Sequence, residues 1–318
     1  MQDWIKHLID IKDQVYPPFD YFFDPSRRIF LGYLLSALLL SIFVFYRRKK
    51  HHKTSLFRYI YNSKHWFGAS ARVDYIIIVL NTFVKIGLIA NWLYLGRHFS
   101  IYVDEFLQNT IGYNTIQLSK TTTLVSYTVC IILFNDLMVY TVHYLFHRIP
   151  FLWEFHKTHH SASSLTPFTQ YRLHPVELIC NNFALIFSFG LLTGIFDFMS
   201  QHSIHQWEFI GVNIFSFLFF IFGANLRHSH VQLSYPSFLE NLFISPLQHQ
   251  IHHSDNPKHF NKNLGSKLAI WDWLFGTLVK SKEVNELKFG IGEEEKSYAT
   301  SITKNLFGPF MKWFSKKK

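Results

Sequence analysis

The sequence predicts an all-α protein, a polytopic integral membrane helical bundle, and three observations lead to this prediction. The chain has 318 residues, of which 49% are hydrophobic and 19% aromatic. Only 16% are charged, against about 25% in soluble globular chains. Histidines gather in three short clusters at helical spacing, next to long apolar segments. The chemistry of these clusters is the main clue to function.

Five segments are apolar enough to cross a bilayer, which takes about 20 mostly apolar residues. They are residues 29–46, 75–95, 122–142, 178–196 and 207–226. Lys85 interrupts the second segment and Asp136 lies in the third. Only a short polar stretch separates the last two, which alternatively form one re-entrant hairpin.

The basic run at residues 47–53 follows the first segment and predicts the orientation of the chain. Loops rich in Lys and Arg stay on the cytoplasmic side. Counting the four further crossings after this loop places every histidine cluster, and the basic residues 316–318, on the cytoplasmic face. We therefore expect a multi-pass integral membrane protein with its histidines on that face.

We expect one domain, because no linker or internal repeat divides the chain. Within it, residues 1–121 would form N-terminal transmembrane helices and loops, 122–280 a catalytic region, and 281–318 a basic tail. The net charge of +10 lies mainly in runs beside apolar sequence, which indicates anionic membrane head groups and not nucleic acid.

Two smaller features exclude other classes of protein. The cysteines Cys130 and Cys180 lie in apolar stretches, so neither a disulfide framework nor a thiolate metal site is expected. The first residues lack a basic segment followed by an apolar one, so no cleaved signal peptide is expected.

The three histidine clusters read HxxxH, HxxHH and HxxHH. Residues at i, i+3 and i+4 share one face of a helix, so each cluster points two or three imidazoles at one spot. Imidazole suits Fe, Zn, Cu and Ni. Eight histidines exceed the about four ligands of one zinc ion, so they indicate two metal ions close together. The predicted ligands are His143, His147, His156, His159, His160, His249, His252 and His253.

Three further histidines are candidate ligands. His228 and His230 follow the fifth apolar segment, and we expect both to complete the site, which requires a non-helical backbone between them. Alternatively, one binds metal and the other is a surface histidine. His174, just before Pro175 at an expected helix start, is a further ligand, orients one, or is a helix-start residue near the membrane interface.

Asp136 and Tyr140 lie on the same helical stripe as His143 and His147. A carboxylate inside an apolar helix is costly and usually faces a polar partner. Metal-bound imidazoles commonly donate their other N–H to a carboxylate. We therefore expect Asp136 to accept a hydrogen bond from a ligand histidine.

With these residues in hand, the chain resembles the sterol desaturase / fatty acid hydroxylase superfamily over roughly residues 122–280. The matching motifs are Asp136…Tyr140…His143-xxx-His147, Phe155-His156-xx-His159-His160-Ser161, His174-Pro-x-Glu177, Asn225-x-Arg227, Pro246-xx-His249-xx-His252-His253-Ser254, Asn263-x-Gly265 and Trp271-Asp272-x-Leu274-Phe275-Gly276-Thr277.

The resemblance implies a cytoplasmic histidine-bound pair of Fe ions that uses O₂ and externally supplied electrons to hydroxylate or desaturate a lipid. No catalytic residue beyond the metal centre is implied, and Glu177 and Asn263 would support the centre together with Asp136 and Tyr140. Zinc binds imidazole better than Fe(II) and can replace it in purified protein. The chain shows no dinucleotide or haem motif, so a separate ferredoxin, cytochrome or reductase would supply electrons.

One departure from the family concerns the third ligand group. Many members carry an isolated histidine just before the Asn-x-Arg motif, whereas this chain has Phe222-Gly223-Ala224 there and its histidines follow the motif. The sequence does not choose between hydroxylation and desaturation, and it names neither the substrate nor an oligomeric state.

Two other classes of function stay open. A metal transporter would hold its site near the bilayer midplane, whereas these histidines are expected at one face. A membrane zinc hydrolase needs about three ligands and a general-base Glu, but Glu154 and Glu177 form no HExxH motif. Within the family, a carotenoid hydroxylase, an ether-lipid monooxygenase and a sterol or fatty-acyl oxidase are alternatives.

Overall fold

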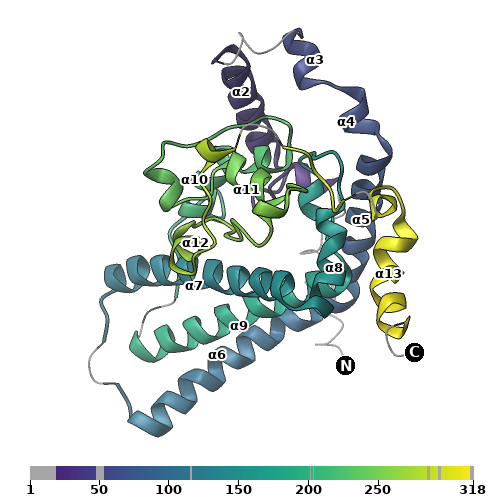
Figure 1. Cartoon of the computed structure of the whole chain (residues 1–318). Coiled ribbons are helices and arrows are strands. Elements are labelled where there is room, and N and C mark those ends of the chain that lie inside the picture. Colours follow the sequence, from purple (N-terminus) through teal and green to yellow (C-terminus); the bar gives the residue numbers. More distant parts are fainter. Residues whose placement is uncertain are drawn as a thin grey trace.

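The computed structural model describes residues 19–47, 54–114, 117–200, 202, 204–284, 287–292 and 295–315, and nearly all its regular structure is helical (Figure 1). Among these residues the only strand pair is a short antiparallel hairpin of β1 (Glu208–Phe209) and β2 (Val212–Asn213). The prediction of a mainly helical chain is confirmed. Basic residues 48–53 and 316–318 and the chain start, on which predictions rested, lie outside the described residues.

Among the described residues, two helices are long and apolar enough to cross a membrane. They are α7 (Lys120–Arg148, 29 residues) and α9 (Pro175–Met199, 25 residues), and they contain the third and fourth predicted segments. The Ser119 side chain caps α7 by accepting from Thr122 N–H, and Pro175 occupies the first turn of α9, where its missing N–H costs nothing.

The long helices α6 (Ala90–Ile111), α9 and α7 lie side by side at the bottom of Figure 1. Glycines allow α6 to approach α9 closely: a Cβ on Gly190 would lie 2.7 Å from the Gly96 carbonyl oxygen, and one on Gly194 only 2.4 Å from that of Ser100. Small residues four apart permit such contact between apolar helices. The Leu118 amide donates to the Met199 carbonyl at 2.9 Å, so α7 and α9 run antiparallel.

The first two predicted segments are less regular than expected. Helix α2 (Leu31–Arg47) is apolar but has 17 residues, short of the about 20 expected of a span. In the second, α5 (Ala69–Val84) passes through a π-helical turn, Lys85–Ile89, into α6. Residues Leu56–Phe67 and Ala69–Gly87 form a pair bent by 68° that would count as a third span.

The prediction of a fifth span at residues 207–226 is wrong. This segment forms the β hairpin, then α10 (Ile214–Ile221) and the 3₁₀ segment η5 (Ala224–His228). Left-handed backbone at Gly211 (φ 76°) and Gly223 (φ 105°) interrupts the helix on both sides. The eight residues of α10 rise about 12 Å, far less than the roughly 30 Å of the hydrocarbon core.

The histidine clusters lie where short helices gather near the C-terminal end of α7. Helix α8 (Pro150–His160) follows α7 directly, and α11 (Pro246–His252) and α12 (Ile270–Leu274) lie over α7 in Figure 1. The other helical elements are η1 (Asp20–Phe22), α3 (Leu56–Ile60), α4 (Ser63–Phe67), η4 (Thr169–Tyr171), η6 (Leu239–Asn241), η7 (Pro257–His259), η8 (Ser281–Glu283), η9 (Lys296–Ala299) and α13 (Ile302–Ser315).

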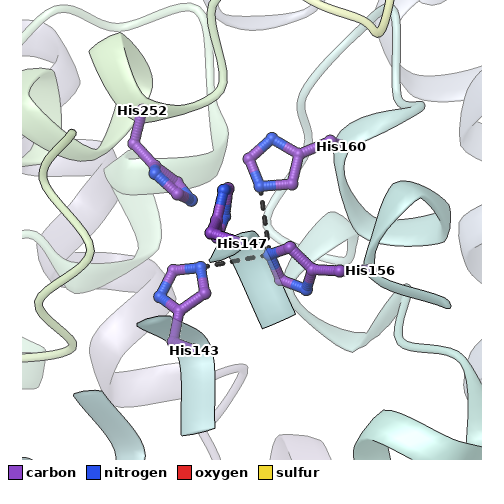
Figure 2. A group of neighbouring side chains, drawn as sticks. All are labelled: His143, His147, His156, His160 and His252. Atoms are coloured by element: carbon purple, nitrogen blue, oxygen red, sulfur yellow. Dashed lines mark hydrogen bonds between the residues drawn. The ribbon is translucent and has the colours of Figure 1, made fainter. Parts of the chain in front are cut away.

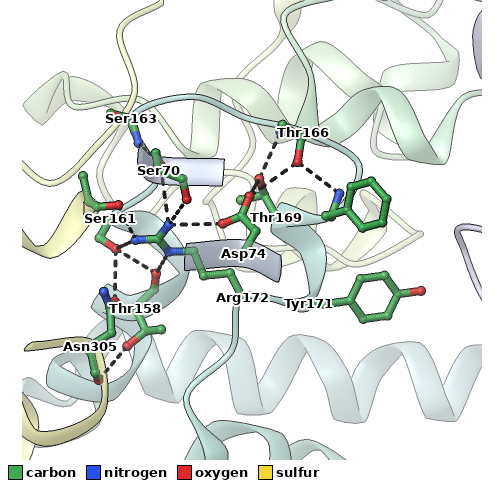
Figure 3. A network of polar contacts seen from close by, with 12 residues as sticks. Ser70, Asp74, Thr158, Ser161, Ser163, Thr166, Thr169, Tyr171, Arg172 and Asn305 are labelled. Carbon is green, nitrogen blue, oxygen red and sulfur yellow. Dashed lines mark hydrogen bonds and ion pairs between the residues drawn. The ribbon is translucent and has the colours of Figure 1, made fainter. Parts of the chain in front are cut away.

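A buried arginine fixes the histidine-bearing end of α8 (Figure 3). Arg172 pairs with Asp74 of α5 at 3.1 Å and donates to the Thr158 carbonyl at 2.8 Å and to the Ser161 hydroxyl at 2.7 Å. It also donates to two carbonyls of the segment before α13. Because Thr158 precedes His159, this network positions α8 against three other parts of the chain.

Candidate metal centre

Nine histidine side chains converge in one place from α7, α8, η5 and α11. A five-histidine group contains His143, His147, His156, His160 and His252. A four-histidine group contains His159, His228, His249 and His253. In each group the ligand nitrogens lie within 4.8 Å of one another, and Figure 2 shows the rings of the five-histidine group facing a common point.

The two HxxHH clusters are divided between the groups in opposite ways. In α8 the first and last histidines join the five-histidine group, and the middle one, His159, joins the other. In the α11 cluster the middle one, His252, joins the five-histidine group, and the outer two join the other. Adjacent helical residues point about 100° apart, so neighbouring histidines serve different groups. The groups touch where His160 and His253 stack, with ring centroids 4.6 Å apart.

The spacing of the Nε2 atoms suits metal coordination in the five-histidine group. Nε2 of His156 lies 3.1 Å from Nε2 of both His143 and His160. Two nitrogens bound at right angles to one ion, each at about 2.1 Å, are roughly 3 Å apart. Nε2 of His147 and His252 is buried and has no hydrogen-bond partner within the described part of the chain.

The four-histidine group shows the same spacing. Nε2 of His249 lies 3.1 Å from Nε2 of His228 and 3.2 Å from Nε2 of His253. Nε2 of His228 is also 3.4 Å from Nε2 of His159. All four rings are buried. The nitrogens therefore face one another among buried rings, and a cation would satisfy them.

Burial also keeps these rings in the form that binds metal. It lowers the pKa of His159 to about 3. It lowers the pKa of the other ligand histidines in α8, η5 and the α11 cluster well below the ordinary value, because loss of water disfavours the charged ring. Neutral imidazole is the ligand form, so the residues present fit a pair of metal ions.

Glu177 orients one ligand of the five-histidine group. Its Oε1 lies 2.9 Å from Nδ1 of His156, and both side chains are buried. A carboxylate there holds the proton on Nδ1 and leaves Nε2 free for a metal. The position of Glu177 in the first turn of α9 brings a candidate membrane span into direct contact with the centre.

A loop after α11 orients two more rings through backbone carbonyls. Nδ1 of His143 lies 2.7 Å from the Leu264 carbonyl oxygen, and Nδ1 of His252 lies 2.9 Å from that of Lys262. Asn263, between them, has a left-handed backbone (φ 52°), which Asn tolerates better than most residues. Its side chain donates to the Gln248 carbonyl of α11 at 3.0 Å, so the loop is tied to the helix it serves.

Asp272 holds this loop in place. Its carboxylate accepts from the amides of Leu264 and Gly265, each at 2.7 Å, and from the Thr277 hydroxyl at 2.5 Å. Tyr140 from α7 lies 3.2 Å from Thr277, oxygen to oxygen. Tyr140 and Asn263, predicted to support the centre, thus belong to the structure around the ligand-orienting loop.

Asp136 has a different partner from the one expected. Among the described contacts, its carboxylate accepts from the amides of Lys267 and Leu268 at 2.9 and 3.0 Å and from Trp271 Nε1 at 3.1 Å, and from no ligand histidine. The loop contacts α7 at Asp136. Asp136 therefore fixes the segment that follows the carbonyls of Lys262 and Leu264, and it influences the orientation of the ligand rings only indirectly.

Arg227 contacts the four-histidine group and has no assigned role in the sequence analysis. Its Nη2 lies 2.7 Å from Nδ1 of His249, and its guanidinium also donates to the Gly265 and Ser266 carbonyls. Burial lowers the pKa of Arg227 to about 9. A guanidinium has only hydrogen-bond donors, so Nδ1 of His249 accepts from Arg227. Nδ1 of His143 and of His252, in contrast, faces a carbonyl oxygen. The sequence signals for Arg227 are its place in the Asn225-x-Arg227 motif and its position directly before His228.

His230 and His174 lie in neither group. η5 ends at His228, and the following backbone carries His230 against His65, with stacked rings whose centroids are 5.3 Å apart. His174 caps α9: its Nδ1 accepts from the Val176 amide at 3.1 Å, and its Nε2 lies 3.1 Å from the Leu306 carbonyl oxygen. Its two nitrogens are therefore already engaged.

Two cavities reach the centre. The first, about 360 Å³, is lined by histidines of both groups, by α5 and α9, and by the segment before α2. The second, about 380 Å³, is lined by His147, His160 and His252, by Trp153 and by residues of the loop after α11. The first has the volume of a small-molecule site and a partly apolar wall that includes Leu178 and Leu185.

Comparisons with known proteins point to one family. Residues 128–277 match the model of the fatty acid hydroxylase family. An alkylglycerol monooxygenase from Caenorhabditis elegans is 29% identical over 166 residues, 52% of this chain and 29% of that protein. A Delta(7)-sterol 5(6)-desaturase from Gibberella zeae is 25% identical over 251 residues, 77% of this chain and 64% of that protein.

A third relative, the ornithine lipid hydroxylase OlsE from Rhizobium tropici, is 27% identical over 169 residues, 52% of this chain and 45% of that protein. The chain thus spans less than two thirds of the length of each of these relatives. No solved structure matches the chain significantly.

Proposed function

This chain belongs to the sterol desaturase and fatty acid hydroxylase superfamily, and on that basis we propose that it is an integral membrane oxidoreductase that uses O₂ to hydroxylate or desaturate a lipid. The observation that carries the proposal is the pair of adjacent histidine groups, in each of which the ligand nitrogens face one another, beside a partly apolar cavity. The relatives are named as a lipid monooxygenase, a sterol desaturase and a lipid hydroxylase.

The proposed cofactor is a pair of iron ions, one held by each histidine group. When bound, the irons would supply the activation of O₂, reduced with electrons from a separate donor, for the oxidation of an unreactive C–H bond. The donor set consists only of neutral imidazoles, which suit iron and also zinc. Zinc can therefore occupy the same positions in purified protein, and the metal must be identified by experiment.

The side chains around the irons would position the substrate and keep water away. Leu178 and Leu185 of α9 and Val139 of α7 form part of the cavity wall and suit a hydrocarbon chain. Glu177 Oε1 lies 2.9 Å from His156 Nδ1 and would orient that ring. Its Oε2 has no partner within the described part of the chain, so it can accept or return a proton at the edge of the cavity.

In the proposed arrangement α7 and α9 cross the membrane and the histidines lie at its cytoplasmic face. The apolar wall of the first cavity lies on these helices, so a lipid would enter from the bilayer. A separate electron donor, a ferredoxin, cytochrome or reductase, would approach from the second cavity. Trp153, which lies 5.2 and 5.4 Å from the rings of His147 and His160, is half-buried there.

The first experiment is the metal content after anaerobic purification from iron-replete cells, with the His159→Ala/His252→Ala variant beside it. These two substitutions remove one ligand from each group. We expect about two iron ions per chain in the wild type, one for each group, and a loss of both in the variant. Cellular lipids would then be compared with and without the gene to find the oxidised product.

Other results would reject the proposal. One zinc ion per chain from iron-replete cells, with no O₂-dependent change in any lipid, would favour a membrane zinc hydrolase. A metal content that is the same in both proteins would mean that the histidine groups do not form the metal site.

A further inference from the structure

The cavity beside the histidines is lined by cations that include two without an ion-paired carboxylate among the described residues. Arg27, Arg28 and Lys85 line this cavity together with the metal ligands. Arg27 pairs with Asp24 at 3.0 Å. Within the described part of the chain, neither Arg28 nor Lys85 forms an ion pair with a carboxylate.

Arg28 and Lys85 both contact aromatic rings. The Arg28 guanidinium lies 5.8 Å from the centre of the Phe220 ring, and the Lys85 ammonium lies 5.5 Å from that of Tyr21. Such contacts recover only a small part of the hydration that burial removes. Arg28 and Lys85 are half-buried, and half-buried cations without an ion-paired carboxylate favour an anion supplied from outside the chain.

The same end of the cavity has polar acceptors without donors. Oδ1 of Asn81 and Oε1 of Gln170 are buried and have no hydrogen-bond partner among the described residues, and both side chains line the cavity. Their amide nitrogens donate to backbone carbonyls, which leaves the oxygens free. This end of the cavity therefore suits a hydrated or hydroxyl-bearing group and not a hydrocarbon chain.

The remaining wall is apolar. Leu178 and Leu185 lie on one face of α9, two helical turns apart, and Ile78 and Val139 contribute from α5 and α7. Leu185 is 37% exposed, so this wall continues to the outer face of a candidate membrane span. One cavity thus combines a cationic polar end, an apolar wall and the two histidine groups.

We propose that the substrate is a lipid with an anionic head group, a phosphate or a carboxylate, which Arg28 and Lys85 bind while its hydrocarbon chain lies along α9 next to the histidines. The proposal rests on the proposed function, because it names the substrate class of that site. Guanidinium and ammonium groups both bind phosphate and carboxylate strongly when water is excluded.

The test measures binding and oxidation separately on the full chain, purified with iron in detergent micelles. Three palmitoyl probes differ in the head group: palmitoyl lysophosphatidic acid carries a phosphate, palmitate carries a carboxylate, and 1-palmitoylglycerol is neutral. The variants are Arg28→Gln/Lys85→Gln and the matched control Arg72→Gln, which removes an exposed cation from α5, the helix leading to Lys85.

We expect the wild type and Arg72→Gln to bind at least one anionic probe about tenfold more tightly than the neutral probe, the effect of about one charge-assisted contact. The double variant should lose this preference and keep its affinity for 1-palmitoylglycerol and its iron content. The head group preferred by the wild type distinguishes phosphate from carboxylate.

Equal binding of all three probes by the wild type, or an unchanged preference in the double variant, would overturn the inference even if the protein oxidises a neutral lipid. Anionic binding that depends on Arg28 and Lys85, without effect on which lipid is oxidised, would also overturn it, because the cations would then hold a bystander lipid. Absence of iron and of any O₂-dependent oxidation, with binding preserved, would instead reject the proposed function.

Discussion

His228 and His230, two residues apart, have different surroundings and should respond differently to substitution. His228 Nε2 lies among the nitrogens of the four-histidine group, whereas His230 stacks on His65. We predict that His228→Ala lowers bound iron from about two ions to about one per chain, because the smaller group would keep only three ligands. His230→Ala should retain both ions.

Metal analysis of the two variants, purified side by side, checks this prediction. The pair is well matched, because the same change is made at neighbouring positions near the end of one 3₁₀ segment. Equal loss of iron in both variants would mean that His230 also binds, as the sequence analysis expected. If neither variant loses iron, then neither His228 nor His230 binds metal.

At the residue scale, the sequence identified all nine histidines that converge, because HxxHH at helical spacing is informative by itself. It did not predict which histidines share a group, because that depends on how α8 and α11 face each other. It also could not identify the carbonyls of Lys262 and Leu264 as partners of ligand histidines, because every residue has a backbone carbonyl and the residue type does not reveal which one accepts. The partner of Asp136 was misassigned because spacing along α7 says nothing about the loop packed against it.

At the scale of elements, the loop after α11 is the part on which the five-histidine group depends most. It orients two rings through carbonyls, and the Asp272 carboxylate holds two of its buried amides. In Asp272→Ala these amides would lose their acceptor, which costs about 1–3 kcal/mol for each buried group. We predict weaker iron binding in the five-histidine group by at least about tenfold, as for other changes beyond the direct ligands.

Competition with a chelator measures the iron affinity of each group. In Asp272→Ala the five-histidine group should release its iron at a lower chelator concentration than the four-histidine group. The four-histidine group should be less affected. Asp255→Ala is the control, since Asp255 is partly exposed and pairs only loosely with Lys288, at 3.5 Å. Unchanged chelator resistance in Asp272→Ala would show that the loop does not govern ligand orientation.

Among the elements, α7 and α9 were predicted well because a long apolar run with at most one charged residue has few alternatives to a helix of membrane length. The fifth segment failed for the opposite reason. Residues 207–226 are as apolar as a span, but they are packed against α2 and interrupted by left-handed glycines. Apolar content alone does not distinguish a segment buried by protein from one buried by lipid.

At the scale of the whole molecule, the clusters meet even though the count of five crossings does not hold. α7 ends and α9 begins beside the centre, so one antiparallel pair supplies His143, His147 and Glu177 from the same end. The chain then returns to η5 through the hairpin and α10 instead of a second full span. The cytoplasmic orientation remains a prediction, because it rests on basic residues of which most lie outside the described part.

The number of buried histidines makes the stability of the metal-free protein depend on pH. In the folded chain the pKa of His159 is lowered to about 3, and those of the other ligands in α8, η5 and the α11 cluster are also lowered. Unfolded histidines titrate near 6.5. Between about pH 6.5 and 3 the unfolded state therefore binds more protons. Stability is fully present above this window and falls as the pH decreases through it.

We predict a steep fall, because each such histidine contributes up to about 1.4 kcal/mol per pH unit within its window. Thermal unfolding of the metal-free protein in micelles at several values from pH 7.5 to 5 checks the slope. His159→Gln should reduce it, since one titrating group is removed. Replacing His98 and His205, which lie outside both groups, with Gln should leave it unchanged. A flat profile in the wild type would mean that the nine rings are open to water when metal is absent, so that the centre is assembled by the metal and not by the fold.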